Sequence, residues 1–190
     1  MSEEMTEPAL ERLMTFEEAA KIDPDSNPGE LEAGRFVAVP KGTWRHGVIV
    51  INVGGVLKRY ARSHPGWSVS AGDPGTKLTH NPDTLRGPDV AIVRTDRVPQ
   101  GRGADGWLEG APDVAVEVIG DAQSASELAR KALEYLEAGG KMVWVIDPEP
   151  RRLMLFSEGN RVSVLGPDDT LEGGDVLPGF NCKVAEFFED

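Results

Sequence analysis

The sequence predicts an α/β domain in which a mixed β-sheet is flanked by helices, and three observations favour this class. Residues 114–119 and 142–147 are apolar runs of the length and composition of buried strands. Residues 124–138, which lie between them, carry apolar side chains at helical spacing. Gly- and Pro-rich turns separate further short, strand-like pieces upstream. Strands that alternate with a helix in this way are typical of a layered α/β fold.

The N-terminal part, up to residue 63, is predicted to contain two helices and one strand. Thr15 followed by Glu18 forms a capping-box pattern at the start of a short helix. After a turn at residues 23–29, a glutamate-bearing segment leads into a strand over residues 35–39. Residues 44–63 are predicted as a long helix because their apolar positions fit a period of 3.6, namely Val48, Ile49, Val53, Val56, Leu57 and Tyr60.

The rest of the chain, from residue 67 onward, is predicted to supply most of the sheet. Its expected elements, in chain order, are strands at 67–70, 90–94 and 114–119, a helix at 124–138 that Gly139-Gly140 ends, a strand at 142–147, a hairpin at 152–165 that turns at 158–160, and a short helix or cap at 185–190. The loop over residues 100–112 is expected to be exposed.

Length and composition indicate one domain over residues 1–190, with residues 1–13 loosely ordered. Apolar residues make up 39% of the chain and charged residues 27%, which is typical of a soluble globular protein. No window approaches eighteen consecutive apolar residues, so we expect no membrane span. The single cysteine, Cys182, excludes an intramolecular disulfide and a cysteine zinc cluster, and a cytoplasmic location is the simplest expectation.

The formal net charge of −12 restricts the way in which the protein would contact nucleic acid. A protein that binds DNA mainly by neutralising phosphates is usually basic. We therefore do not expect broad, non-specific affinity for DNA.

Glu117 is the first candidate for chemistry because it lies within the apolar run at 114–119. In an extended segment, Val114, Val116 and Val118 take one face, and Glu117 shares the other face with Ala115 and Ile119. A buried carboxylate is costly unless a partner or a metal stabilises it. The alternative is a structural glutamate that is protonated or paired with an arginine.

Asp89 is the second candidate, since Pro-Asp opens the strand at 90–94 as it opens the strand at 114–119. Pro-Asp is also ordinary turn chemistry. If the two strands are adjacent, however, Asp89 lies beside Glu117, and two carboxylates with a backbone carbonyl suit Mg²⁺ or Mn²⁺. Asp113 lies roughly 13 Å from Glu117 along the strand, too far to share one ion.

The helix at 124–138 contributes the third candidate, Lys131, at the rim of an apolar stripe formed by Leu128, Ala132, Tyr135 and Leu136. A lysine there can bury its stem and direct its ammonium group towards a carboxylate. The alternative is an ordinary Glu127–Lys131 pair. Glu30 and His46 are lesser candidates, for which a structural or solvated role is the alternative.

Seven segments, in order, resemble the Uma-type family of putative restriction endonucleases within the PD-(D/E)XK nuclease superfamily. They read MTFEEAA, GELEAGRFV, RHGVI, GPDVAIV, GAPDVAVEVIGD, KALEYLEAGGKMVWVIDP and DVLPGF, and the resemblance covers residues 14–188. The resemblance implies a restriction-endonuclease-like core of order αβββαβ, with an additional C-terminal hairpin.

The resemblance also implies roles for individual residues. Asp89 and Glu117 would be metal ligands together with the backbone carbonyl of Val118. Ile119 stands where the superfamily has lysine, and in this family a helix lysine, here Lys131, is proposed to replace it. Glu30 would match a glutamate of the first helical segment, and His46 the histidine that opens the long helix. Gly120-Asp121 departs from the Ser-Pro that is usual in the family.

These features favour a nuclease that uses Mg²⁺ or Mn²⁺ to hydrolyse phosphodiester bonds of DNA. One alternative is a nuclease fold that serves as a binding or assembly module without catalysis. Another is a metal-dependent hydrolase of a different phosphate ester. A homodimer would suit an enzyme that cuts both strands of a duplex.

Overall fold

The computed structural model describes residues 12–120, 123–159 and 161–190. The expectation that residues 1–13 are loosely ordered therefore lies outside the described residues, apart from the last two. Asp121 and the last position of the expected 158–160 turn also lie outside them.

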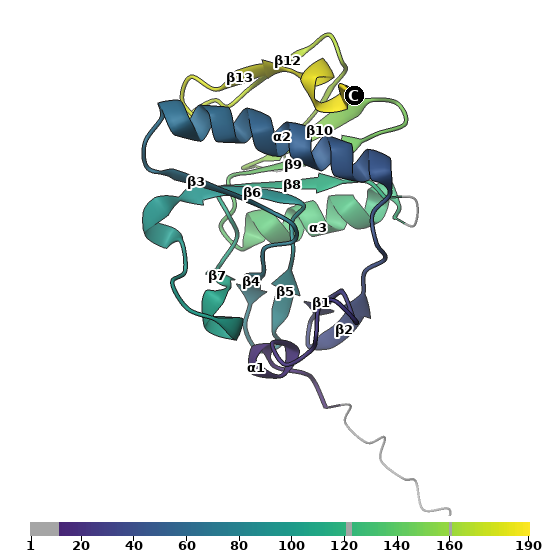
Figure 1. Ribbon diagram of the computed structural model, residues 1–190, viewed down its shortest axis with the longest axis vertical. Helices are drawn as coiled ribbons and strands as arrows, with labels where there is room; N and C mark the ends of the chain where they lie inside the picture. The colour runs from purple at the N-terminus through teal and green to yellow at the C-terminus, as the bar shows by residue number, and fades with distance from the viewer. Residues whose placement is uncertain (1–11, 121–122, 160) are drawn as a thin grey trace, which may run out of the picture.

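Among the described residues the strands form three sheets, and the largest holds six strands in the order β11-β10-β9-β8-β6-β3 (Figure 1). This sheet is mixed, because β8 and β9 are parallel and all other neighbours are antiparallel. Its strands are β3 (Trp67–Ala71), β6 (Val90–Arg94), β8 (Val114–Val118), β9 (Met142–Asp147), β10 (Arg152–Ser157) and β11 (Arg161–Leu165).

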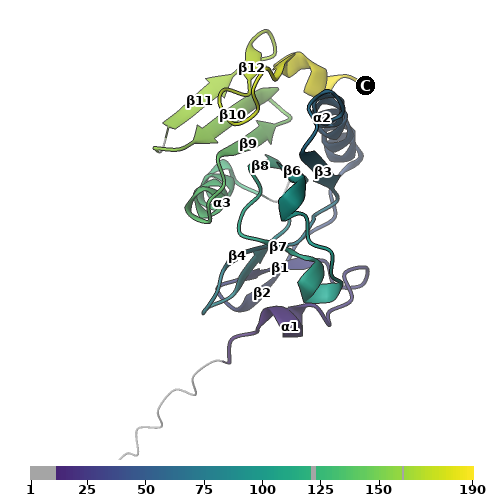
Figure 2. The same cartoon turned by 90° about the vertical axis from the view of Figure 1, so that its left-hand side faces the viewer.

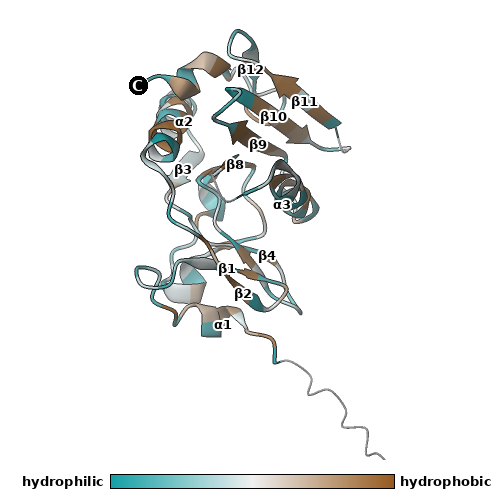
Figure 3. Cartoon of the chain, turned by 90° about the vertical axis from the view of Figure 1, so that its right-hand side faces the viewer, coloured by the Kyte–Doolittle hydropathy of each residue, from teal (hydrophilic) through white to brown (hydrophobic). Residues whose placement is uncertain are grey.

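The two long helices, α2 (Trp44–Ser63) and α3 (Ala125–Glu137), cover opposite faces of this sheet (Figures 1 and 3). Val114, Val116 and Val118 belong to the core cluster beneath α2, whereas Ala115 belongs to the cluster beneath α3. The order α2-β3-β6-β8-α3-β9 confirms the predicted αβββαβ core, and β10 and β11 form the additional hairpin.

A second sheet of five strands, in the order β2-β1-β5-β4-β7, lies beside one end of the core (Figure 2). It contains β1 (Gly29–Glu32), β2 (Arg35–Ala38), β4 (Thr76–Thr79), β5 (Thr84–Arg86) and β7 (Leu108–Glu109). Short helices lie next to it, α1 (Phe16–Ala19) with the predicted Thr15 capping box, η1 (Thr95–Arg97) and η2 (Gly103–Gly106).

Most of this sheet was not predicted. The segment around Glu30 was expected to precede a strand, but it is itself strand β1, which pairs with β2 through a turn at Ala33 and Gly34 that has positive φ at both residues. Strands β4 and β5 were missed because three or four residues are too few to display a period. The expectation that residues 100–112 form an exposed loop was wrong in part: residues 100–103 are exposed, but Leu108 and Ala111 are buried.

The C-terminal residues pack against α2 and against the face of the large sheet that α2 covers, opposite α3 (Figures 1 and 2). They comprise the two-stranded sheet of β12 (Thr170–Glu172) and β13 (Asn181–Lys183) and the 3₁₀ helix η3 (Val184–Phe188), which confirms the predicted final cap. In the part of the chain described, no helix is long and apolar enough to cross a membrane.

Helix α3 has a defined start, end and docking face. Ser124 accepts a hydrogen bond from the Glu127 N–H, and Glu127 caps the Ser124 N–H in return. Gly139, which follows the helix, has a φ of 94° that favours glycine. The buried side of α3 consists of Leu128, Lys131, Ala132 and Tyr135, so three apolar residues fix the helix on which Lys131 sits.

We predict that Leu128→Ala lowers the free energy of unfolding by about 2–5 kcal/mol, because Leu128 is 1% exposed and its loss leaves a cavity under α3. The matched control is Leu133→Ala on the same helix, where the side chain is 41% exposed and we expect a change within about 1 kcal/mol. Urea denaturation measures both. Equal effects of the two substitutions would contradict the docking described for α3.

Candidate active site

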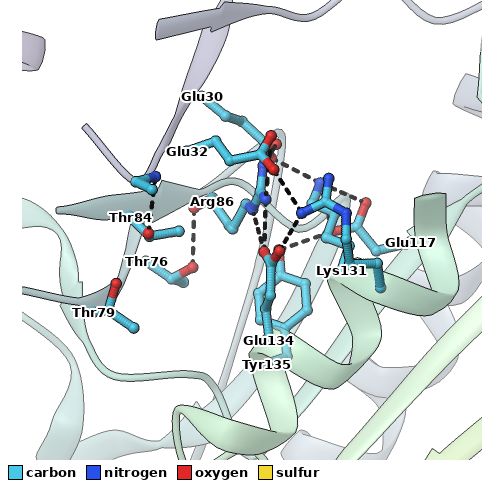
Figure 4. A network of polar contacts seen from close by, with 12 residues as sticks. Glu30, Glu32, Thr76, Thr79, Thr84, Arg86, Glu117, Lys131, Glu134 and Tyr135 are labelled. Atoms are coloured by element: carbon cyan, nitrogen blue, oxygen red, sulfur yellow. Dashed lines mark hydrogen bonds and ion pairs between the residues drawn. The ribbon is translucent and has the colours of Figure 1, made fainter. Parts of the chain in front are cut away.

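The candidate site lies where the two sheets meet. Strand β5 ends at Arg86, and Gly87-Pro88-Asp89 then carries the chain directly into β6 of the large sheet. This short link brings Asp89 next to β8, while Glu30 approaches from β1 and Lys131 from α3 (Figure 4).

Asp89 and Glu117 occupy opposing positions on neighbouring strands. Strands β6 and β8 are antiparallel with Val90 opposite Val116, so the preceding residue, Asp89, lies across from Glu117. One oxygen of Asp89 accepts a hydrogen bond from the Val118 N–H at 2.6 Å, which holds its carboxylate against β8. The structure therefore brings together the two acids that the sequence analysis selected.

Glu117 is buried beneath α3, with a side chain that is 4% exposed. Its Oε1 accepts hydrogen bonds from the Tyr135 hydroxyl at 2.8 Å and lies 2.9 Å from Lys131 Nζ. Its Oε2 lies 3.0 Å from the same nitrogen. Burial, opposed by the Lys131 charge and reinforced by the charge of Asp89, raises the pKa of Glu117 to about 7. The cation that contacts Glu117 is Lys131 and not the arginine considered as an alternative.

Lys131 bridges two carboxylates. Its Nζ lies 2.7 Å from Glu30 Oε1 in addition to its contacts with Glu117, and its side chain is 10% exposed. Burial acts to lower the pKa of Lys131, but the charges of Glu117 and Glu30 outweigh burial and raise that pKa above its usual value. The alternative Glu127–Lys131 pair does not form, since Glu127 caps the helix at Ser124.

Glu30 lies on strand β1 and not in a helix, which corrects the position that the family resemblance implied. Its Oε1 accepts from the Gly87 N–H at 2.9 Å as well as from Lys131, and its Oε2 accepts from Arg86 Nη1 at 3.0 Å. Burial raises the pKa of Glu30, but Lys131 and Arg86 outweigh burial and lower it. The side chain therefore lies in the site as a charged support for Lys131.

His46, the third residue of α2, faces the same site. Its Nε2 lies 3.2 Å from Asp89 Oδ1. The hydrogen bond to Asp89 is the main cause that raises the pKa of His46, and burial opposes it. Asp89 is thus held by an imidazole on one oxygen and by a main-chain N–H on the other.

The carboxylates suit a divalent cation by their chemistry. Asp89 and Glu117 supply hard oxygen donors from opposing positions, the type of ligand that Mg²⁺ and Mn²⁺ prefer. Across residues 12–120, 123–159 and 161–190, no three His, Cys, Asp or Glu side chains converge to enclose an ion, and Lys131 already engages both oxygens of Glu117. An ion at this pair would therefore compete with Lys131 for Glu117.

Comparison with known families agrees with the order of elements and residues. The family model Uma2, described as "Putative restriction endonuclease", matches residues 15–185. The chain belongs to this family. The expected Uma-type resemblance is thereby confirmed, and the match covers the whole candidate site.

Comparison with solved structures supports the fold of this Uma2 member. A crystal structure of a putative nuclease belonging to DUF820 from Anabaena variabilis ATCC 29413 is similar, with a TM-score of 0.78. The two sequences are 18% identical, and the similarity covers 92% of this chain and 97% of that chain. At this identity the likeness concerns the fold. A comparison with curated protein sequences finds no match.

Three residues at this Uma2 site were not predicted as functional. Arg86 contacts Glu30, Tyr135 contacts Glu117, and Asp73 lies at the rim, where crowding by protein atoms and the charge of Asp89 raise its pKa. Tyr135 was assigned only to the apolar stripe, and its position one turn after Lys131 was the available signal. Arg86 had a weaker signal, its place three residues before Asp89.

The raised pKa of Glu117 leads to a prediction about stability and pH. Because the folded protein favours protonated Glu117, its contribution is complete below the ordinary pKa of 4.5 and is lost as pH rises through about 7. In buffer with a chelator, the free energy of unfolding should therefore fall from pH 5 to pH 8 more steeply in wild type than in Glu117→Gln.

Denaturant titrations at several pH values measure this difference. The pKa of His46 is also raised, in part by the charge of Glu117, so the comparison is repeated in a His46→Gln background, where only Glu117 differs. Parallel pH dependences for wild type and Glu117→Gln would refute the raised pKa.

Proposed function

We propose that the protein is a divalent-metal-dependent nuclease that hydrolyses phosphodiester bonds of DNA. Family and fold support a nuclease-like role. The observation that carries the finer proposal is the arrangement of Asp89 and Glu117 on opposing strand positions with the Lys131 ammonium within 3.0 Å of Glu117. The homodimer and the cytoplasmic location remain predictions.

Asp89, Glu117 and the Val118 carbonyl would hold the metal ion. When bound, a divalent ion supplies Lewis-acid activation of water and offsets negative charge on the phosphoryl group. The Val118 N–H and His46 orient the carboxylate of Asp89. In the hydrolysis a water oxygen forms a bond to phosphorus, the bond to the leaving oxygen breaks, and the proton that the water loses is balanced by one that the leaving group gains.

Lys131 acts in this proposal as a cation and not as a general base. Two carboxylates within 3.0 Å raise its pKa, so the amine stays protonated at neutral pH. A fixed positive charge beside the acids would stabilise the charge that develops on the phosphoryl oxygens. The net charge of −12 disfavours contact between the protein and the phosphates of DNA. The positive charge of Lys131 would offset part of this repulsion at the site.

We predict that Asp89→Asn and Glu117→Ala each lower Mn²⁺-dependent cleavage of plasmid DNA by at least roughly 100-fold, because each removes a carboxylate needed at the reacting centre. The matched control is Asp113→Asn, since Asp113 also follows a proline at the start of a strand but contacts Arg97 and the Arg94 N–H. Cleavage by Asp113→Asn should stay close to wild type. Unchanged cleavage by folded Glu117→Ala would refute the assignment.

A second function, a binding or assembly module that keeps the nuclease fold without catalysis, is favoured by one observation. Ile119 occupies the position of the usual lysine, and both oxygens of Glu117 are engaged by Lys131 and Tyr135. A module of this kind has no need of a divalent ion, whereas the nuclease requires one.

Calorimetric titration with Mn²⁺ separates the two functions. We predict that wild type and Asp113→Asn bind the ion and that Asp89→Asn does not, because Asp89 supplies the carboxylate that lies opposite Glu117. Absence of a binding signal in wild type would favour the module. A panel of plasmid, single-stranded DNA, RNA and nucleotides would then show whether a binding-competent protein hydrolyses a different phosphate ester.

A further inference from the structure

Arg86 has an unusual environment for an arginine. Within the described residues, the buried charged side chains are Arg86, Glu117 and Lys131, and all three belong to one network (Figure 4). Arg86 is the last residue of β5, and its side chain is 4% exposed. Burying an arginine is costly unless its donors are satisfied by acids, so its partners define its role.

The guanidinium group joins two elements that are distant in sequence. Its Nη1 donates to Glu30 of β1 at 3.0 Å, while its Nε and Nη2 donate to Glu134 of α3 at 2.8 and 2.6 Å. The planar guanidinium group has five N–H donors in a fixed fork, so it can donate two hydrogen bonds to Glu134 and a third to Glu30. The main chain of Arg86 is held too, since its carbonyl accepts from the Thr76 hydroxyl at 3.0 Å.

The contact with Glu30 connects Arg86 to the candidate site. Arg86 binds Oε2 of Glu30, and the other oxygen, Oε1, contacts Lys131 Nζ at 2.7 Å. Lys131 therefore lies between Glu30 and Glu117 at similar distances. If Glu30 had no second cation, its full charge would draw Lys131 away from Glu117, because attraction between buried charges is weakly screened.

We propose that Arg86 is a positioning residue that neutralises Glu30 and thereby keeps Lys131 shared between Glu30 and Glu117. The substrate is not contacted by Arg86 itself, which acts through Glu30. The inference rests on the proposed function only where it assigns Lys131 a role in hydrolysis. The alternative role for Arg86 is simple attachment of α3 to the small sheet through Glu134, and the two roles predict opposite changes at Lys131.

The test is the rate at which an amine-acetylating reagent modifies Lys131 in the folded, metal-free protein, followed by peptide mass spectrometry. In Arg86→Met we expect this rate to fall by roughly tenfold, the effect of about 1.4 kcal/mol of added attraction to Glu30. In Glu30→Gln we expect a rise, because one of the two partners of Lys131 loses its charge. Lys141, whose side chain is 47% exposed, serves as the internal reference.

The double variant Arg86→Met/Glu30→Gln completes the comparison. If Arg86 acts through Glu30, its removal has no further effect once Glu30 is neutral, so the double variant should match Glu30→Gln. A mere attachment role would loosen α3 and speed modification of Lys131 in both backgrounds, which would overturn the proposal. An unchanged rate in folded Arg86→Met would also overturn it.

Two controls test whether a changed modification rate at Lys131 has another cause. Arg97→Met removes another arginine that binds an acid and main-chain carbonyls, remote from Lys131, and should leave the Lys131 rate unchanged. Near-UV circular dichroism confirms that each variant is folded. If Arg86→Met does not fold, Arg86→Lys replaces it, and we expect a smaller fall of the same sign because the charge stays but the planar group is lost.

Kinetics then links this inference to cleavage. With DNA and Mn²⁺, Arg86→Met should lower kcat while KM stays within about threefold, because a buried group that avoids substrate affects positioning and not binding. Should wild type show no cleavage, the proposed function fails, and the acetylation rates still decide the role of Arg86.

Discussion

The structure depends on how the protein stabilises the buried carboxylate of Glu117. Glu117 lies on a strand that α2 covers on one face and α3 on the other, so water cannot solvate its charge. The sheet itself offers no cation to this position, and both the ammonium of Lys131 and the hydroxyl of Tyr135 come from α3. The charge state of Glu117 therefore depends on the docking of α3, which carries both of these partners.

The small sheet also contributes charged side chains to the network around Glu117. Lys131 is itself buried, and Glu30 of β1 supplies a second carboxylate beside it. Glu30 in turn lies against Arg86, which reaches back to Glu134 on α3. The chain of contacts begins and ends on the same helix, so charged groups of the small sheet lie next to the α3 residues that face the candidate site.

The sequence predicted the parts of this arrangement that follow from local periodicity. The two faces of residues 114–118 and the position of Lys131 at the edge of the α3 stripe could be read from alternation and helical spacing. Arg86 could not be identified in this way, since its closest partners, Glu30 and Glu134, are 56 and 48 residues away in the sequence. Strand β1 was equally hidden, because Gly-Glu-Leu-Glu has one apolar residue and forms a strand only through pairing with β2 and β5.

Placing the amine on a helix changes what controls the site. A lysine at position 119 would extend from the strand that carries Glu117, two residues and about 7 Å further along the chain. Ile119 instead packs against the apolar cluster under α3. The amine of Lys131 reaches Glu117 only while α3 keeps its place and while Glu30 does not capture it. In this Uma2 member the position of the charged amine is thus set by the packing between helix and sheet and by the charge balance around Glu30, so residues remote from the reacting atoms control the geometry on which the proposed hydrolysis depends.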